Sequence, residues 1–364
     1  MTSTERVAVL GTGLIGTSIA MAAARAGDQV RGFDTDQAVL EAAAERSGLS
    51  PAPTLDECVR GATLVFACTP IPALPQLVVE ALRASPEAVV TDVGSVKSHL
   101  MVEIEAKAEP SDLPRYVGGH PMGGSERSGP DHASPSVLDG IAWVIAPSSA
   151  TDEAAVERLE SWISGVGARP VRIDAERHDR LVAMVSHLPQ VASTALMALA
   201  ATEEAGEPEI LLLAAGGFRD LTRLAASNPR LWSDILLANR EAIARAIDLY
   251  VERLRTLRDE VLAEDSPRVE ATFARAKAAR LALAAKPQVR SGVSVLLVPV
   301  PDRPGVLAEV TAAMSQAEVN IEDLQIVHSP EGGRGTVHLT VAAGSAEAAE
   351  RALRDRWFEP LRLA

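Results

Sequence analysis

Hydrophobic and polar positions change their spacing twice along the chain, which divides it into three regions. From residue 6 to about residue 173, short β-branched runs alternate with longer amphipathic stretches. This alternation predicts a parallel, doubly wound α/β sheet of the Rossmann type. The expected strands are RVAVLG, QVRGFD, TLVFAC, AVVTDV and WVIAP, and the expected helices cover residues 14–26, 36–46, 73–84, 97–108 and 152–166.

From about residue 174 to residue 284, the apolar positions take helical spacing and the sequence is rich in Ala, Leu, Arg and Glu. Breaks fall at Gly206 with Pro208, at Asn228-Pro229 and at Ser266-Pro267. An all-helical block of this size beside a nucleotide-binding domain is typical of a substrate wall, a dimer interface, or both. The expected helices cover residues 176–204, 208–226, 229–262 and 266–284.

After the Lys286-Pro287 linker, the pattern becomes strand, helix, strand, strand, helix, strand. The two helices are expected to begin at Pro304 and Ser345. This order is typical of a ferredoxin-like α+β domain. We therefore expect three domains: a nucleotide-binding domain over 1–173, a helical substrate and dimerisation domain over 174–286, and a small ferredoxin-like domain over 291–364.

Composition and charge narrow the classes of function. A chain of 364 residues, 47% of them apolar, has material for two or three buried cores. The net charge of −14 opposes a nucleic-acid partner or an anionic membrane, and an anionic substrate would need positive charge supplied locally. Cys58 and Cys68 form no disulfide or zinc motif. Without a convincing signal peptide or an apolar stretch that could span a bilayer, we expect a soluble cytoplasmic protein.

The run GTGLIGTS at residues 11–18 lies between the first expected strand and helix. Its glycines allow a tight turn, close approach to a pyrophosphate and close packing of helix on strand. Asp34, which ends the second strand, can bond the ribose 2′-hydroxyl and repels a 2′-phosphate, so NAD is favoured over NADP. Arg31 comes too early to bind that phosphate. The expected cofactor contacts are Gly11, Gly13, Leu14, Ile15, Gly16, Asp34, Thr69 and Pro70.

Three further segments contain candidate chemistry. TDVGSVK at 91–97 places Ser95 at the carboxyl end of the sheet, where open α/β sheets bind ligands. YVGGHPMGGSERSGP at 116–130 predicts a glycine-rich loop close to a ligand, with His120 at a strand end and Glu126 six residues later. The third is split: SHLPQ at 186–190 contains His187, and GGFRDLTRLAASNPRLW at 216–232 contains Arg219 and Arg223, which share a helix face.

These segments, together with GTGLIGTS and ACTP at 67–70, resemble the prephenate dehydrogenase family of tyrosine biosynthesis over about residues 6–245. The small departures, in HPMGGSER and at Arg219, concern the fit of the substrate. The resemblance implies NAD-dependent oxidative decarboxylation of prephenate to 4-hydroxyphenylpyruvate. This reaction needs a base with a pKa near neutrality, which histidine provides, and it needs no metal.

The resemblance also implies roles for single residues. His120 is the expected general base, and Ser95 bonds and orients it. Arg223 is the expected clamp for a substrate carboxylate, which a guanidinium binds bidentately. His187 assists with the second carboxylate or packs near the nicotinamide, while Glu126 and Arg219 are gate or secondary contacts. Surface or structural positions are expected for His99, His132, His178, His328 and His338.

The segment DRPGVL at 302–307 resembles the turn of an ACT domain, a module that often binds amino acids at a dimer interface. Pro304 suits the first turn of a helix, and Gly305 permits close backbone approach. The resemblance suggests feedback control by tyrosine, and a purely structural dimerisation domain is the alternative. The expected contacts of the regulatory ligand are Asp302, Pro304, Gly305 and Val306.

Two alternatives to the leading function remain open. Arogenate is the rival substrate within the class, and Glu126 is ambiguous for the amino group that distinguishes it. A catalytically silent sensor of NAD and an amino acid is the alternative from another class, and the joint presence of Ser95, His120 and Arg223 opposes it. In either case we expect a homodimer formed through the helical block.

Overall fold

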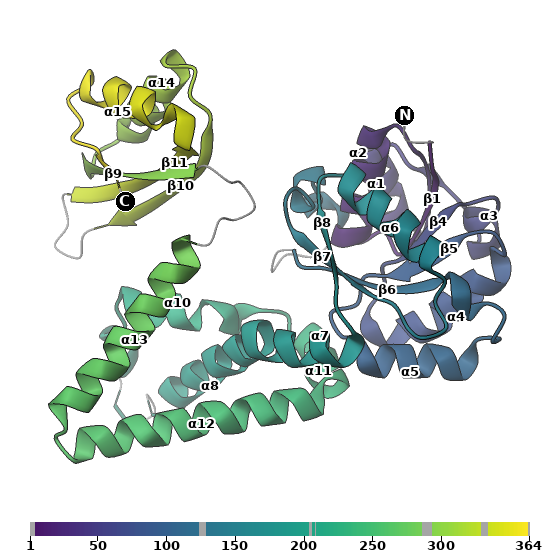
Figure 1. The fold of residues 1–364 in the computed structure, drawn as a ribbon, viewed down its shortest axis with the longest axis horizontal. Coiled ribbons are helices and arrows are strands. Elements are labelled where there is room, and N and C mark those ends of the chain that lie inside the picture. The colour runs from purple at the N-terminus through teal and green to yellow at the C-terminus, as the bar shows by residue number, and fades with distance from the viewer. Residues whose placement is uncertain are drawn as a thin grey trace. The chain divides into compact units, whose positions relative to one another are not determined.

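The computed structural model describes residues 4–123, 129–203, 206–207, 209–285, 293–328 and 334–362. By its internal contacts the chain divides into two compact units, residues 1–262 and residues 263–364. The first unit contains a large sheet with helices on both faces and a block of long helices, and the second contains a long helix and a small sheet (Figure 1).

The first unit is built on an eight-stranded sheet with the order β3-β2-β1-β4-β5-β6-β7-β8. Strands β3, β2, β1, β4, β5 and β6 run parallel to their neighbours, as the alternating pattern predicts, but β7 is antiparallel to β6. The sheet is therefore mixed at this edge. The strands are β1 (Arg6–Leu10), β2 (Gln29–Phe33), β3 (Ser50–Pro51), β4 (Leu64–Ala67), β5 (Val89–Asp92), β6 (Tyr116–Pro121), β7 (Ala142–Ala146) and β8 (Arg169–Arg172).

Apolar residues that alternate along the strands feed two cores, one on each face of the sheet. In β1, Val7 and Val9 pack on the side of α1, α2 and α6, while Ala8 and Leu10 pack on the side of α3, α4 and α5. Burial on both faces explains why these strands are apolar along most of their length. The helices are α1 (Leu14–Ala26), α2 (Gln37–Ser47), α3 (Leu55–Val59), α4 (Leu74–Ala84), α5 (Ser98–Lys107) and α6 (Glu153–Gly165).

The helical block contains more breaks than the sequence predicts. The expected helix over 208–226 is divided into α9, α10 and a 3₁₀ turn at Arg223–Ala226, with the first break before the Gly216-Gly217 pair. The expected helix over 229–262 ends and restarts at Asn239, whose side chain turns inward to bond the Asp179 carbonyl. The helices are α7 (Ala175–Val182), α8 (Leu188–Glu203), α9 (Glu209–Leu212), α10 (Gly216–Thr222), α11 (Pro229–Ala238) and α12 (Arg240–Leu262).

A π-helical turn, Ala183–His187, joins α7 and α8 into one helical segment, Ala175–Glu203. By length and composition alone this segment could cross a membrane, with a mean hydropathy of 1.4 over its most apolar stretch. However, it holds the buried polar side chains of His178, Asp179 and His187. Since buried charged and polar groups must be paired within the protein, these side chains pack inside the helical block, while Leu181, Val185 and Leu199 of the same segment are exposed.

The second unit contains α13 (Ser266–Ala285) and a four-stranded antiparallel sheet of order β10-β11-β9-β12. Two helices pack on this sheet through an aliphatic core. The strand order confirms the expected ferredoxin-like arrangement. Its elements are β9 (Val293–Pro301), α14 (Val306–Gln316), β10 (Ile321–His328), β11 (Arg334–Ala342), α15 (Ala346–Arg354) and β12 (Leu361–Arg362).

Both helices of this small domain start one or two residues later than expected. Helix α14 begins at Val306 rather than Pro304, because Gly305 at its N-cap takes a left-handed φ of 89°, which glycine adopts most readily. Asp302, Pro304 and Gly305 are exposed on this turn, whereas Val306 is buried in the core. Any contact of Val306 with a regulatory ligand would therefore come from its backbone.

Candidate active site

The turn between β1 and α1 has the geometry that its glycines predict. Gly11 has a φ of 92°, and a Cβ atom there would lie 2.7 Å from the Cys68 carbonyl oxygen. A Cβ atom on Gly16 would lie 2.0 Å from the Gly11 carbonyl oxygen, so this glycine lets the helix pack on the turn. Gly13, in contrast, has nothing within 4 Å of its Cβ position. The N-terminus of α1 thus has an open face for a pyrophosphate.

Asp34 lies half-buried after β2, beside this turn. Its carboxylate accepts hydrogen bonds from the backbone N–H of Thr12 at 2.7 Å and from that of Asp36 at 3.0 Å. Arg31 is turned away, since its guanidinium donates to backbone carbonyls of Glu57 and Arg60. A carboxylate without a guanidinium beside it suits the ribose diol of NAD.

Thr69, at the end of β4, has a buried hydroxyl oxygen with no hydrogen-bond partner among the described residues. Buried polar atoms in proteins are almost always paired, so an unpaired one marks a place for a ligand or water. Together with the open Gly13 and the carboxylate of Asp34, it fits a bound dinucleotide. Pro70 follows, exposed, and introduces a 3₁₀ turn at Ile71–Ala73.

Helix α11 connects the helical block to the carboxyl end of the sheet. Ile235 packs with Ile71, which follows β4, and with Val96, which follows β5. Ser95 lies half-buried next to Val96, and its hydroxyl makes no hydrogen bond within the part of the chain that the structure describes. The packing of α11 therefore brings the Ser95 loop against the helical block.

The segment with His120 is a strand rather than the expected loop. Gly118 and Gly119 are buried inside β6, and a Cβ atom on Gly119 would lie 2.6 Å from both the Asp92 carbonyl oxygen and the Thr91 hydroxyl. These glycines are thus required by packing between β5 and β7, and not by a nearby ligand. His120 follows them, half-buried, near the carboxyl end of β6.

His120 is held by a second histidine. Its Nδ1 lies 2.9 Å from Nε2 of His178, and Nδ1 of His178 lies 2.8 Å from a carboxylate oxygen of Asp179. Of the two expectations for His178, a surface or a structural position, the surface position is excluded, since only 1% of the residue is accessible. The spacing of residues along α7 does not indicate the contact between His120 and His178, because the two residues lie 58 positions apart in the sequence.

Burial and neighbouring ionisable groups shift the pKa values in this cluster. Burial lowers the pKa of His120 well below its usual range, and His178, Lys97 and His187 lower it further. Burial alone would raise the pKa of Asp179, but hydrogen bonds from His178 and from the backbone of Lys97 and Ser98 outweigh it and lower that pKa. His120 is therefore neutral and Asp179 ionised at neutral pH.

A buried ion pair fixes β5 against β6 beneath the cluster. The ammonium of Lys97 contacts the carboxylate of Asp92, and both side chains are fully buried. The same carboxylate accepts hydrogen bonds from the Tyr116 hydroxyl at 2.8 Å and the Gly94 N–H at 2.7 Å. This pair joins both ends of the loop that contains Ser95 to the strand that contains His120.

His187 lies in the π-helical turn and is also buried. Its Nδ1 lies 3.3 Å from the amide nitrogen of Asn239, which also donates to the Asp179 carbonyl at 2.9 Å. Since an amide nitrogen only donates, His187 accepts at Nδ1 and holds its proton on Nε2. The Trp232 ring packs edge-on against it. Burial lowers the pKa of His187 to about 4, so the neutral ring offers one N–H donor.

The two arginines lie on exposed surface of the helical block, Arg219 in α10 and Arg223 at the start of the 3₁₀ turn that follows. Gln190 of α8 fixes this turn by donating to the Leu224 carbonyl at 2.7 Å. No contact between either arginine and His120 is found among the described residues, so the structure does not itself join them into one site. Glu126 lies outside the described residues.

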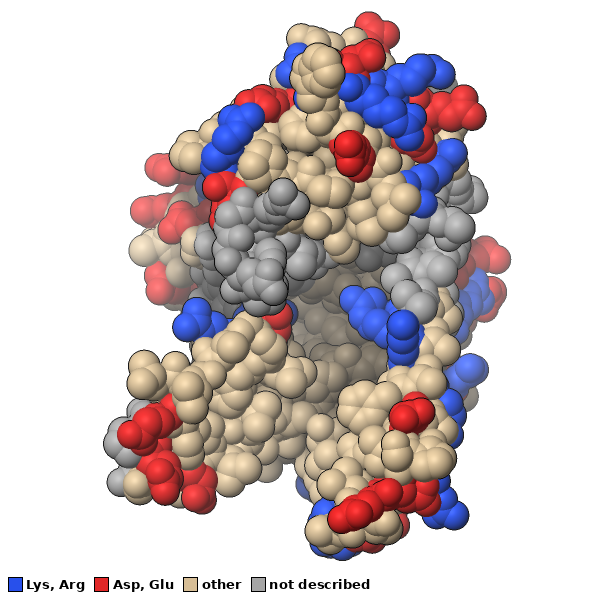
Figure 2. Space-filling model, turned by 90° about the vertical axis from the view of Figure 1, so that its left-hand side faces the viewer, with Lys and Arg blue, Asp and Glu red and all other residues tan. Residues whose placement is uncertain are grey.

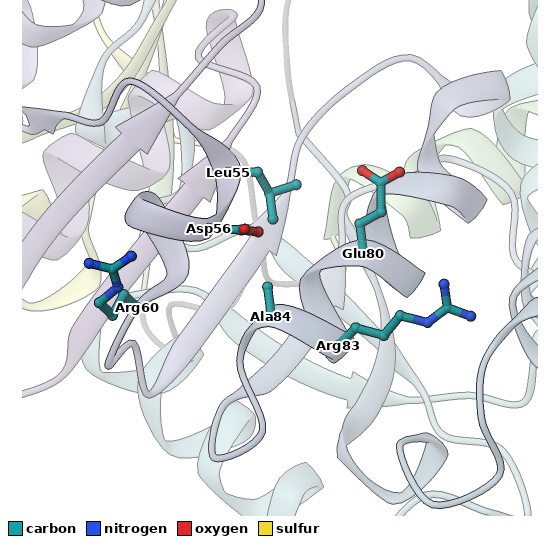
Figure 3. A pocket seen from close by; sticks show the side chains of 6 residues that line it. All are labelled: Leu55, Asp56, Arg60, Glu80, Arg83 and Ala84. Atoms are coloured by element: carbon teal, nitrogen blue, oxygen red, sulfur yellow. The ribbon is translucent and has the colours of Figure 1, made fainter.

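An open pocket between α3 and α4 is separate from these residues (Figure 3). Its charged side chains point in different directions, and none of the predicted site residues lines it. It therefore offers no convergent set of groups for chemistry. Its lining residues are Leu55, Asp56, Arg60, Glu80, Arg83 and Ala84.

Comparison with protein families assigns all three regions of the chain. Residues 19–172 match the prephenate dehydrogenase nucleotide-binding domain, and residues 174–275 match the prephenate dehydrogenase dimerization domain. The chain belongs to the prephenate dehydrogenase family. Residues 294–358 match the ACT domain, which confirms the expected class of the small C-terminal domain.

Individual members of the family are similar over most of their length. The prephenate dehydrogenase of Bacillus subtilis is 31% identical over 343 residues, which are 92% of this chain and 92% of that protein. The solved structure of the A. aeolicus prephenate dehydrogenase with hydroxyphenyl propionate and NAD+ superposes with a TM-score of 0.72 and 26% identity, over 78% of this chain and 99% of that one. The Synechocystis arogenate dehydrogenase gives a TM-score of 0.67 and 29% identity, over 76% and 98%.

These matches confirm several expectations from the sequence. The chain is an NAD-dependent oxidoreductase of the prephenate dehydrogenase family, with a Rossmann-type domain, a helical dimerisation domain and a C-terminal ACT domain.

Proposed function

We propose that this member of the prephenate dehydrogenase family catalyses the oxidative decarboxylation of prephenate to 4-hydroxyphenylpyruvate, with His120 as the general base. The observation that supports this best is the state of His120 near the carboxyl edge of the sheet. It is half-buried and neutral, and among the described residues its hydrogen bond is made through Nδ1. A base must be deprotonated before it can accept a proton, and this environment keeps it so.

NAD would be held by Gly11, Gly13, Gly16, Asp34 and Thr69, with Leu14, Ile15 and Pro70 beside them, and when bound it supplies the acceptor for a hydride. His120 takes the proton of the ring hydroxyl on Nε2 as the hydride leaves the same carbon. The ring carboxylate then departs as carbon dioxide, and its bonding electrons make the ring aromatic. The oxygen ends as a phenol after it takes back a proton.

The substrate is a dianion, so it needs local positive charge against a chain of net charge −14. We assign one carboxylate to Arg223 and the other to the N–H of His187, with Glu126 and Arg219 as secondary contacts. Among the described residues no hydrogen bond joins Ser95 to His120, contrary to its expected orienting role, so we assign the half-buried Ser95, in the loop after β5, to the reacting end of the substrate. Arginine suits the first role because its fork binds a carboxylate bidentately.

Replacing His120 tests the assignment of the base. The variant His120→Asn should reduce turnover by about 10²- to 10⁴-fold, the usual loss for one general base. The production of NADH, followed by its absorbance with prephenate as substrate, gives the measurement, and circular dichroism shows that the fold is intact. Unchanged turnover would remove His120 from the role of base.

Arogenate is the second candidate substrate, because an arogenate dehydrogenase is among the solved structures similar to this chain. It has an amino group where prephenate has a keto group, and it would need an acidic partner or fewer cations near the side chain. Comparing kcat/KM for the two compounds decides between them. A chain that produced NADH from neither would instead be a sensor of NAD and an amino acid.

We propose that tyrosine regulates the enzyme through the ACT domain, by contacts with Asp302, Pro304, Gly305 and the backbone of Val306. The turn at Gly305 is exposed and takes a left-handed φ, so its backbone can approach a ligand closely. Titrating tyrosine against initial rate, in the full chain and in a chain that ends at residue 286, tests this. An equal response of both would place any inhibition at the active site.

We further propose that the enzyme is a cytoplasmic homodimer, formed through the helical block. Within residues 4–262, apart from the gaps, every large apolar side chain that is strongly exposed, except Val102, lies beyond residue 174. Figure 2 shows largely uncharged surface over the lower part of the view, with acidic side chains gathered towards its tips. Apolar surface of this extent in a soluble protein marks an interface.

The proposed functional boundaries are 1–173, 174–286 and 291–364. The division by contacts instead keeps residues 1–262 together as one unit, and it groups α13, residues 266–285, with the ACT domain. We assign α13 to the dimerisation domain by function, since the family match to that domain extends to residue 275.

A further inference from the structure

His178 and Asp179 have no place in the mechanism above, yet they form a continuous line of hydrogen bonds that ends on His120. The two steps of this line measure 2.9 Å and 2.8 Å between heavy atoms. His178 is 1% exposed and Asp179 5% exposed, so water does not compete for these bonds. The line joins β6 of the nucleotide-binding domain to α7 of the helical block.

The position of each proton along this line follows from the chemistry of Asp179. Its carboxylate also accepts the backbone N–H groups of Lys97 and Ser98, both at 2.8 Å, so it is an acceptor on every side. His178 must then donate from Nδ1, and a neutral His178 has only a lone pair left on Nε2. His120 in turn must donate from Nδ1 to that lone pair. Nε2 of His120 is therefore unprotonated, which is the form that can accept a proton.

We propose that His178 is a positioning residue for His120, which fixes the base in its Nε2-unprotonated tautomer and shares the positive charge that forms on it. This inference rests on the proposed role of His120 as the base. The sequence motifs SHLP, GGHP and GSVK do not include His178 or Asp179. These two residues lie in the AERHDR stretch of α7.

The proton balance of the reaction fits such a partner. The hydroxyl O–H bond breaks, and its proton goes to Nε2 of His120, while the C–H bond breaks with its electron pair leaving as hydride. The Nδ1 proton of His120 can then shift to Nε2 of His178, which becomes an imidazolium paired with the Asp179 carboxylate. When the C–C bond to carbon dioxide breaks and the ring becomes aromatic, both shifts reverse and the oxygen regains its proton. The proton is thus returned to the oxygen from which it came, and both histidines end in their starting tautomers.

The tautomers can be measured directly in the unmodified protein. Long-range ¹H–¹⁵N spectra of the full chain with ¹⁵N-labelled histidine distinguish a protonated ring nitrogen from a bare one. His120→Asn and His178→Gln assign the two sets of signals. We expect His120 and His178 both to carry their proton on Nδ1 at neutral pH. A proton on Nε2 of His120 would overturn the inference, and this readout does not depend on activity.

Kinetics of His178→Gln test the effect on the reaction. Glutamine can accept the Nδ1 proton of His120 in a hydrogen bond but cannot become a cation. We expect kcat to fall by about 10- to 100-fold, the usual effect of losing an outer hydrogen-bond partner, with KM for NAD and for prephenate unchanged. His132→Gln, at an exposed position outside the site, is the matched control and should leave kcat unchanged.

The outcomes separate this inference from the function on which it rests. If His120→Asn abolishes turnover while His178→Gln keeps the full kcat, His120 is the base and His178 does not act through it. If His120→Asn itself keeps full turnover, the proposed base is wrong and the inference falls with it. A rise in both KM values with kcat unchanged would show that His178 only supports binding and would also overturn it.

Discussion

His120 meets the first requirement of a general base because its surroundings disfavour the charged ring. Burial is the main cause, and the nearby groups of His178, Lys97 and His187 act in the same direction on its pKa. A histidine with an ordinary pKa of about 6.5 would be partly protonated in mildly acidic solution. This one stays neutral and available there.

The pH profile of kcat/KM should reflect this shift. Protonation of His120 inactivates it, so activity is lost as pH falls through its pKa, and the lowered pKa moves that loss to lower pH. We expect the acid limb of the profile below about pH 6.5, the ordinary histidine value. Rates measured after a return to neutral pH control for acid unfolding. An inflection at or above the ordinary value would contradict the burial of the base.

The arginines of α10 and the following turn provide a matched pair for the substrate clamp. Arg223→Ala should raise KM for prephenate by about 10- to 100-fold, since hydrogen bonds to a charged group contribute about 1.5–3 kcal/mol. Arg219→Ala, one helical turn earlier and equally exposed, should have a smaller effect. Initial rates at varied prephenate give both constants. Equal KM values in Arg223→Ala and the unmodified enzyme would remove Arg223 from the clamp.

The positions of site residues that belong to a sequence motif could be predicted from the sequence. The positions of those outside any motif could not. The glycines lie as their spacing predicts, because the turn that they form is local. Asp34 reaches this turn because β2 pairs with β1 in parallel, as the alternating pattern predicts. His178 and Asn239 take their surroundings from contacts across 58 and 52 residues, to His120 and His187. Neither the spacing of these residues nor their type shows which distant side chain they meet.

At the scale of elements, β6 is the strand that positions the general base His120. It packs so closely against its neighbouring strands that there is no space for a side chain at Gly119. A Cβ atom at Gly119 would press on a backbone oxygen of β5, which cannot move without distorting the sheet. The glycines that this crowding requires are also the reason why the sequence predicts a loop here. Glycine pairs are common in loops, but in this strand they make space for Asp92, Thr91 and Trp143.

Adding one methyl group at Gly119 should therefore be costly. Gly119→Ala is expected to destabilise the fold by about 1–3 kcal/mol, the range for overpacking a well-packed core. Gly217→Ala is the matched control, because it lies in helix α10 with nothing within 4 Å of its Cβ position. It should be neutral or stabilising by up to about 1 kcal/mol. Denaturant unfolding of both variants checks this, and equal midpoints would contradict the crowding at β6.

In the nucleotide-binding domain, all helices except the short α3 could be predicted to within a few residues, whereas the breaks in the helical block could not. Apolar spacing continues across Asn239, so the sequence predicts one helix over 229–262. The break arises because the Asn239 side chain bonds the Asp179 carbonyl and His187. Such a break depends on tertiary contacts that override local helix propensity.

At the scale of the whole molecule, α12 connects the active site to the apolar surface. Near its start, Ala242, Ile243 and Ala246 pack in the core that includes the π-helical turn of His187. Further along, Tyr250 and Leu254 are exposed. With Ile247, Leu257 and Val261 they repeat at intervals of three and four residues, which is typical of a seam between two helices.

This spacing makes α12 the strongest test of the proposed homodimer. Leu254→Glu would remove a leucine from the interface and leave a charge there, and burying one leucine contributes about 1.5–3 kcal/mol. Since 1.4 kcal/mol corresponds to about tenfold in affinity, we expect the dimer to weaken by at least about tenfold. Thr256→Glu adds the same charge at an exposed polar position of α12 and should leave the dimer intact. Light scattering over a dilution series measures the association of both variants.

The variant also shows whether the dimer maintains the active site, because α12 supports His187. A monomeric Leu254→Glu that lost turnover with prephenate would indicate that it does. A dimer unaffected by this variant would place the interface elsewhere.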